Sequence, residues 1–301
     1  MEQLWIAISQ LLYAQAKGYP LSRELSAIPM GRIIAVANQK GGVGKTTTAI
    51  NLAASFAAAE VETLIVDCDP QSNTTSGLGF ARDPDRTNTY HLLTGAAALD
   101  AAIQPTELEQ LWLVPSNRNL TGANLELVEM DRREYRLREA LDGVRGRYRF
   151  VVLDCPPALD LLTLNALVAA DTVLIPMQAE YFALEGVSEL LDTIARIRES
   201  LNPALEVEGV VLTMYDERTN LAQQVAAELR KFFGEKLCAT TVPRNVRLAE
   251  APSHGKPALL YDVRSRGAEA YIRLAKEVMA RGASCEPVVS AERVEADPAK
   301  A

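Results

Sequence analysis

Cysteine is scarce in this chain, and no two cysteines form a CxxC pair. This spacing argues against a zinc site or a disulfide framework and favours buried free thiols in a reducing cytoplasm. Long apolar runs are also missing, since the longest, such as 33–37 and 172–176, are far too short to cross a bilayer. No basic segment precedes the apolar first residues, so we expect neither a secretory signal nor a membrane partner. The four cysteines are Cys68, Cys155, Cys238 and Cys285.

An excess of basic charge is missing as well. The chain has 39 acidic residues against 31 lysines and arginines, a formal net charge of −8. A chain of this charge does not coat nucleic acid through its bulk charge, although a local basic patch remains compatible with it. Hydrophobic residues make up 48% and charged residues 23%, the balance of a globular protein with a sizeable core.

The chain divides into three zones that differ in their pattern of apolar residues. Residues 1–30 form an N-terminal extension, and the alternative is a start codon assigned too early, since Met30 directly precedes the first apolar run. Residues 31–281 alternate short β-branched runs with longer helical patterns and are predicted to be a single domain. Residues 282–301 lack sustained apolar periodicity, which predicts a flexible tail.

Within the middle zone, six short runs are almost continuously apolar, a pattern typical of strands buried on both faces of a parallel sheet. Helical patterns lie between them, so we expect an α/β fold with a doubly wound, mostly parallel sheet flanked by helices. The segment 80–110 has no clear periodicity and is interpreted as an insertion of small helices. The predicted strands are 32–38, 62–67, 111–115, 149–154, 171–176 and 209–214. The predicted helices are 46–59, 135–141, 184–199, 221–233 and 268–280.

The first predicted strand runs directly into a glycine-rich loop, and a helical pattern follows at once. Glycines let a backbone wrap closely around phosphate groups, and the helix N-terminus adds partial positive charge. Lys45 is expected to reach the phosphates and Thr46 to ligate Mg²⁺. The strict phosphate-loop pattern requires glycine where this chain has Gln39, and a second lysine, Lys40, lies inside the loop.

Carboxylates follow two other predicted strands. Asp67 and Asp69 come after one strand, and Asp154 ends another. Because ligands gather at the carboxyl ends of parallel strands, we expect these groups to hold the magnesium shell or to position an attacking water.

A basic stretch lies near the end of the domain. Between residues 218 and 247, six basic residues outnumber two acidic ones, a local charge of +4. Such a surface can bind nucleic acid without sequence preference, although a solvated helix face explains the charge equally well. The six are Arg218, Arg230, Lys231, Lys236, Arg244 and Arg247, and the acidic two are Glu228 and Glu235.

Several motifs in order now resemble one family. NQKGGVGKTTT (38–48), VDCDPQSNTTSGLG (66–79) and VVLDCPP (151–157) are similar to motifs of the ParA/Soj chromosome-partitioning ATPases, which are P-loop NTPases of the deviant Walker A class. LTMYDERTN (212–220) and VPRNVRLAEAPSHGKPALLYDVRSRGAEAY (242–271) resemble the C-terminal half of that family. The resemblance covers about residues 31–281.

The resemblance implies roles for individual residues. Lys40 corresponds to the signature lysine that contacts the nucleotide of a partner subunit, and Asp69 to the aspartate that orients the hydrolytic water. Thr46 and Asp154 correspond to the magnesium site, and Arg218 and Arg247 to residues that bind DNA non-specifically. The implied nucleotide contacts are Lys40, Gly41, Gly42, Val43, Gly44, Lys45, Thr46, Thr47, Pro243 and Asn245.

The resemblance also implies a working cycle. ATP and Mg²⁺ would be the cofactors. An ATP-dependent homodimer would bind double-stranded DNA non-specifically on the nucleoid. Slow hydrolysis, stimulated by a ParB-like centromere-binding protein, would return the dimer to its starting state. The alternative is a MinD-like spatial regulator, or another deviant Walker A ATPase, without DNA binding. A MinD-like protein needs a basic amphipathic C-terminal helix, and the acidic, proline-containing tail does not fit one.

Overall fold

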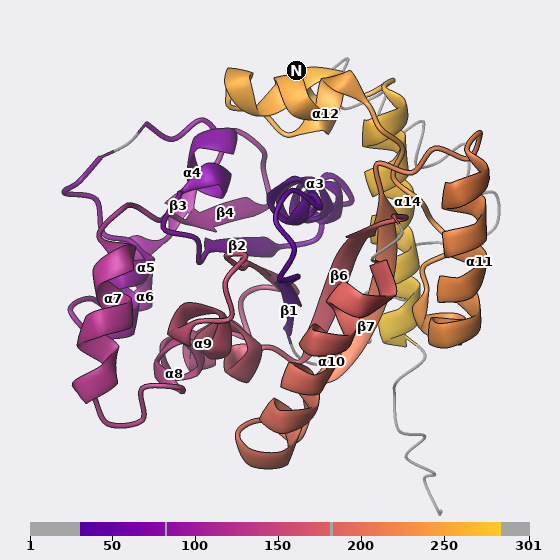
Figure 1. Cartoon of the computed structure of the whole chain (residues 1–301). Helices are drawn as coiled ribbons and strands as arrows, with labels where there is room; N and C mark the ends of the chain where they lie inside the picture. The colour runs from indigo at the N-terminus through magenta and orange to yellow at the C-terminus, as the bar shows by residue number, and fades with distance from the viewer. Residues whose placement is uncertain (1–30, 82, 181–182, 284–301) are drawn as a thin grey trace, which may run out of the picture.

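The computed structural model describes residues 31–81, 83–180 and 183–283 (Figure 1). Among these residues, seven strands form one sheet in the order β3-β4-β2-β5-β1-β6-β7, and every neighbouring pair is parallel except β3 with β4. The strands are β1 (Arg32–Val36), β2 (Thr63–Asp67), β3 (Gln104–Pro105), β4 (Leu111–Val114), β5 (Phe150–Asp154), β6 (Thr172–Gln178) and β7 (Glu206–Thr213).

Helices cover both faces of the sheet. They are α3 (Lys45–Ala58), α4 (Asn73–Gly77), α5 (Thr89–Thr94), α6 (Leu99–Ala102), α7 (Leu120–Glu126), α8 (Arg136–Leu141), α9 (Leu161–Ala169), α10 (Ala183–Ser200), α11 (Asn220–Phe233), α12 (Val246–Glu250), α13 (Ala258–Tyr261) and α14 (Arg266–Ala283). Short 3₁₀ turns are η2 (Leu127–Glu129), η3 (Asp142–Val144), η4 (Gly234–Lys236) and η5 (Ala251–His254).

Each strand sends alternate side chains into two cores. In β1, Ile33 and Ala35 pack into one core with residues of α5, α7, α8, α9, α10 and α11. Ile34 and Val36 pack into the other with α3, α12, α13 and α14. Both faces of the strand are therefore buried, which is why the sequence of β1 is continuously apolar. The predicted doubly wound, single-domain α/β fold is confirmed.

The predicted elements are present with small changes at their ends. All six predicted strands and all five predicted helices appear, and 80–110 contains the small helices α5 and α6. Within the described residues, the prediction missed five helices, α4, α7, α9, α12 and α13, and the two-residue strand β3. The N-terminal extension lies outside the described residues, as does the tail from residue 284, while α14 continues to Ala283, past the predicted helix end at 280 and the predicted domain end at 281.

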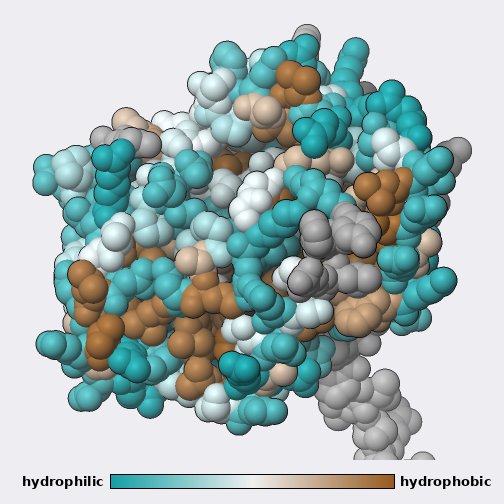
Figure 2. Space-filling view, viewed as in Figure 1, coloured by the Kyte–Doolittle hydropathy of each residue, from teal (hydrophilic) through white to brown (hydrophobic). Residues whose placement is uncertain are grey.

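Apolar surface gathers on one side of the molecule, over α7 to α9 (Figure 2). Large exposed apolar side chains in this region are Leu125, Val128 and Leu159. A groove of about 420 Å³ lies beside them, lined partly by Leu164 and Ile197. None of the residues expected in the nucleotide, magnesium or DNA sites lines this groove.

Candidate nucleotide-binding site

The glycine-rich loop connects the carboxyl end of β1 to the N-terminus of α3. Gly42 and Gly44 have φ angles of +75° and +85°, in the left-handed region where a side chain is strained. Gly44 is the N-cap of α3, and no side chain caps the free N–H groups of the first turn. An uncapped helix N-terminus beneath a loop of glycines is a geometry that binds phosphate.

The two lysines of this loop lie in different environments. Lys45 is buried, only 8% exposed, and its Nζ donates to the carbonyl oxygen of Lys40 at 3.0 Å. Burial lowers the pKa of Lys45, while the charges of Asp154 and Asp69 act in the opposite direction. The Lys40 side chain is 42% exposed and lies at the surface. One lysine therefore faces the inside of the loop and the other faces outward.

Three aspartates meet at the ends of β2 and β5. Asp67 is fully buried, and its Oδ2 accepts hydrogen bonds from the backbone N–H and the hydroxyl of Thr75, at 2.9 and 2.7 Å. Its Oδ1 accepts from the backbone N–H of Asp69 at 3.1 Å. Desolvation raises the pKa of Asp67, and the neighbouring Asp154 raises it further. Asp67 thus fixes the backbone of the following loop.

Asp154 is fully buried and only partly hydrogen-bonded. Its Oδ2 accepts from the Thr74 hydroxyl at 2.7 Å, and its Oδ1 has no hydrogen-bond partner. Desolvation raises the pKa of Asp154, whereas the hydroxyls of Thr74 and Thr46 lower it. An unpartnered buried carboxylate oxygen close to a threonine hydroxyl fits a bound Mg²⁺. In the described ranges, no group of three His, Cys, Asp or Glu side chains could hold a metal ion by itself.

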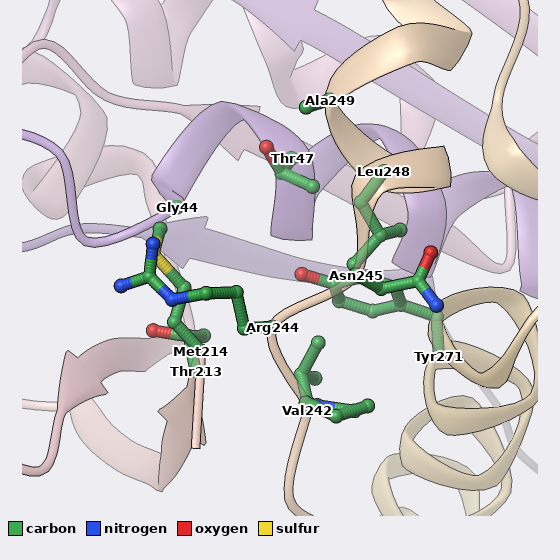
Figure 3. A pocket seen from close by; sticks show the side chains of 11 residues that line it. Gly44, Thr47, Thr213, Met214, Val242, Arg244, Asn245, Leu248, Ala249 and Tyr271 are labelled. Carbon is green, nitrogen blue, oxygen red and sulfur yellow. The ribbon is translucent and has the colours of Figure 1, made fainter. Parts of the chain in front are cut away.

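A pocket of about 170 Å³ lies beside the glycine-rich loop (Figure 3). The segment after η4 runs alongside the end of β7, because Val242 N donates to Leu212 O at 2.8 Å and Tyr215 N donates to Val242 O at 3.0 Å. This pairing brings Pro243 and Asn245 next to the loop. The lining residues are Gly44, Thr47, Thr213, Met214, Val242, Pro243, Arg244, Asn245, Leu248, Ala249 and Tyr271.

The pocket has an apolar body with polar groups at its edge. Figure 3 shows Arg244 and Met214 on one side and Leu248 and Tyr271 on the other. The Tyr271 hydroxyl is hydrogen-bonded to Thr48 Oγ1 at 3.1 Å, which links α14 to α3. An aromatic, apolar pocket adjoining a phosphate loop has the chemistry to hold a nucleotide base.

The two arginines expected to contact DNA lie elsewhere, and both are paired with carboxylates. Arg218 donates from Nε and Nη2 to both oxygens of Asp216, at 2.8 and 2.7 Å. Arg247 pairs with Glu250 at 2.8 Å and with Asp262 at 3.3 Å. The charge of +4 counted from 218 to 247 therefore overstates the positive charge around these two arginines, because their carboxylate partners lie outside that interval in sequence.

Sequence reasoning missed several residues of the site. Thr75 hydrogen-bonds to Asp67, and a signal was available because both lie within one short motif, whereas Thr74 hydrogen-bonds to Asp154, which is far away in sequence. Tyr271, to which the sequence analysis gave no role, lines the pocket. No local pattern indicated Met214, which lines the pocket, or Glu180, whose carboxylate pairs with Lys40, since the order of the strands brings both to the loop.

Comparisons with known proteins agree with this geometry. Residues 31–207 match the AAA domain family. The chromosome partitioning protein ParA of Myxococcus xanthus is 53% identical over 258 residues, 86% of this chain and 91% of that protein. The sporulation initiation inhibitor protein Soj of Bacillus subtilis is 53% identical over 253 residues, 84% of this chain and 100% of that protein.

A solved structure extends the comparison to bound ligands. The crystal structure of cobyrinic acid a,c-diamide synthase from Mycobacterium smegmatis, with bound ATP analogue and magnesium, has a TM-score of 0.72 at 35% identity. The match covers 83% of this chain and 94% of that one. The expected resemblance is confirmed by identity above 50% that extends over most of both sequences: the chain belongs to the ParA/Soj family of chromosome-partitioning ATPases.

Proposed function

We propose that this chain is a nucleotide-gated DNA-segregation ATPase. ATP with Mg²⁺ joins two copies into a dimer, the dimer binds double-stranded DNA without sequence preference on the nucleoid, and slow hydrolysis returns it to monomers. A ParB-like centromere-binding protein stimulates that hydrolysis. The observation that carries the proposal is the separation of the two lysines, one buried inside the phosphate loop and one exposed at its surface.

The exposed lysine supports the dimer for a physical reason. Lys45 is inside the loop and can neutralise the nucleotide of its own subunit. Lys40 is at the surface, so its ammonium is accessible to a phosphate brought by a second copy. A cation that arrives from the partner would make ATP part of the interface. Since ADP lacks the terminal phosphate, nucleotide state would then control dimerisation.

Each residue of the site has a distinct task in hydrolysis. The backbone N–H groups of residues 41–47 and the Lys45 ammonium would bind the phosphates, and Lys40 of each copy would stabilise charge that develops in the transition state. Thr46 and Asp154 would hold Mg²⁺, which when bound neutralises charge on the phosphate oxygens. Asp69 would orient the attacking water. Its Oδ1 accepts from Gln71 N at 2.9 Å, which fixes the carboxylate in place.

The proposal is tested by combining nucleotide state with DNA binding. Purified protein is mixed with unrelated double-stranded DNA in the presence of no nucleotide, ADP or a slowly hydrolysed ATP analogue, across a salt series, while light scattering gives the mass. We expect dimers and salt-sensitive DNA binding only with the analogue. Dimers without DNA binding would instead favour a MinD-like regulator. Every helix in the described part of the chain is too short or too polar to cross a membrane.

We expect the Arg218→Ala and Arg247→Ala double variant to lose DNA binding. Both side chains are well exposed, at 85% and 51%. Removing two phosphate contacts should lower affinity at least about 10-fold and reduce the slope of log affinity against log salt by about two per protomer. ATP turnover measured without DNA should stay within about twofold of the unchanged protein, because neither arginine lies at the nucleotide site.

The control for this variant is an equally charged pair elsewhere. Arg132 and Arg147 are also exposed arginines paired with carboxylates, Glu139 and Asp100. Their double alanine variant has the same net charge and loses the same kind of ion pair. If both double variants lose DNA affinity equally, net charge rather than a defined surface explains the binding, and the assignment of Arg218 and Arg247 is wrong.

A further inference from the structure

The exposed lysine of the phosphate loop already has an anionic partner on its own subunit. Lys40 Nζ lies 2.5 Å from Glu180 Oε2, and the two side chains are 42% and 52% exposed. Glu180 follows β6 and comes just before α10, far from Lys40 in sequence. The pair forms because β6 is the neighbour of β1 in the sheet, which brings the segments that follow both strands together at the same edge.

Both backbones that carry this pair are held in place. Gln178 Nε2 donates to Gly42 O at 3.1 Å, which ties the end of β6 to the phosphate loop. Glu180 N donates to Gln178 O, and Ala183 N donates to Glu180 O, each at 2.9 Å, so both backbone groups of Glu180 are hydrogen-bonded.

The lysine side of the pair is anchored to the same strand. Asn38 Nδ2 donates to Pro176 O at 2.7 Å, and Lys40 N donates to Asn38 Oδ1 at 3.0 Å. These hydrogen bonds hold the backbones of Lys40 and Glu180 at the same edge of the sheet. The ion pair therefore joins two exposed side chains that start from backbones tied to each other.

We propose that Glu180 is a positioning residue that retains Lys40 on its own subunit and opposes dimerisation until a triphosphate replaces it. This inference rests on the proposed ATP-dependent dimer. A single carboxylate carries one negative charge, whereas the end of a Mg²⁺-bound triphosphate presents several anionic oxygens. The terminal phosphate of ATP can therefore displace Glu180 from Lys40. ADP lacks that phosphate and cannot compensate for the broken pair, so the glutamate keeps ADP-bound subunits monomeric at concentrations where ATP-bound subunits associate.

The expected change in the dimerisation equilibrium follows from the exposure of the ion pair. Ion pairs between exposed side chains change an equilibrium by up to about fivefold, and about twofold is common. A symmetric dimer breaks two such pairs, so removing the carboxylate should tighten dimerisation by about 4- to 25-fold. The same change should allow some dimer to form with ADP, which the unchanged protein should not do.

The test compares Glu180→Gln with the unchanged chain. Glutamine keeps the shape of the side chain and removes its charge. Glu189→Gln is the matched control, because Glu189 is an exposed glutamate on α10 whose side chain forms no ion pair within the described residues. Dimer dissociation is measured by analytical ultracentrifugation with Mg²⁺ and a slowly hydrolysed ATP analogue, and again with Mg²⁺ and ADP.

A second readout examines the pair without any dimer. Nucleotide-free monomers are treated with a trace of an amine-acylating reagent, and mass spectrometry gives the labelling rate of Lys40 relative to Lys231, an exposed lysine on α11. We expect Lys40 to react about two to five times faster in Glu180→Gln and at the unchanged rate in Glu189→Gln. A structural defect in the loop would alter binding of the analogue, which is measured in parallel.

The two readouts separate the possible failures. Tighter dimers together with faster Lys40 labelling, in Glu180→Gln alone, would support the inference. Unchanged labelling would overturn it, and so would a Glu180→Gln dimer as weak as or weaker than the unchanged one. If both proteins bind the analogue and neither dimerises, the proposed function itself fails, and the role of Glu180 in dimerisation fails with it even where labelling still differs.

Discussion

Replacing Lys45 with alanine is expected to weaken ATP binding at least about 100-fold, a loss of about 2.7 kcal/mol. Lys45 is the buried cation of the phosphate loop, and a charge-assisted hydrogen bond contributes about 1.5–3 kcal/mol. The carboxylates of Asp154 and Asp69 act on Lys45 through their charge. Without the ammonium, these carboxylates would repel the anionic phosphates, so the loss should lie at the upper end of that range. Isothermal titration calorimetry with Mg²⁺ and the slowly hydrolysed analogue measures it.

A matched control separates the loss of this cation from the loss of any lysine. Lys231→Ala removes an exposed lysine from α11, away from the loop, and should leave ATP affinity within about twofold. Thermal unfolding of the nucleotide-free variants checks that Lys45→Ala still folds. ATP affinity that survives Lys45→Ala would contradict the assignment of the glycine-rich loop as the phosphate site.

The fold was predictable wherever burial leaves a periodic or continuous pattern. β1, β5 and β6 are buried on both faces, and their apolar runs mark them as inner strands of a parallel sheet. Helix α9 escaped prediction because seven of its nine residues are buried, which removes the polar stripe that reveals a helix. Strand β3 has only two residues, too few to show any alternation.

The site was predictable where its chemistry is contiguous in sequence. The loop from Lys40 to Thr47 follows a strand and opens a helix, so its role could be inferred before its geometry was known. Glu180 and Tyr271 reach the loop only through the strand order and the packing of α14, which no local pattern encodes. The pairing of Arg247 with Asp262 is likewise a product of the tertiary fold.

Residues that are separate in sequence therefore determine how the loop behaves. A phosphate loop by itself predicts nucleotide binding, which very many proteins share. The proposed switch depends on what surrounds the loop: a glutamate beyond the end of the adjacent strand, an unpartnered oxygen on Asp154, and the carboxylate of Asp69, which Gln71 N holds. Of these, Asp69 offers the clearest separation between binding ATP and hydrolysing it.

Replacing Asp69 with alanine is expected to lower ATP turnover at least about 100-fold while ATP affinity stays within about threefold. A side chain that orients or deprotonates the attacking water contributes about 10²- to 10⁴-fold to the rate. Asp69 is nearly buried, and within the described residues its only accepted side-chain hydrogen bond comes from Gln71 N to Oδ1, which leaves Oδ2 available to a water. Phosphate release under single-turnover conditions measures the rate, and equilibrium titration measures the affinity.

Asp69→Asn tells whether Asp69 acts by accepting a proton or by holding the shape of the loop. The asparagine Oδ1 can still accept from Gln71 N, so the loop keeps its turn, but the amide cannot take a proton. Both variants should therefore lose turnover and accumulate as dimers with ATP itself, at a protein concentration where the unchanged chain returns to monomers. Turnover retained in Asp69→Asn but lost in Asp69→Ala would mean that Asp69 only shapes the loop. Normal turnover in both variants would move the task of orienting water to another group at this edge of the sheet, and slow hydrolysis could no longer be attributed to Asp69.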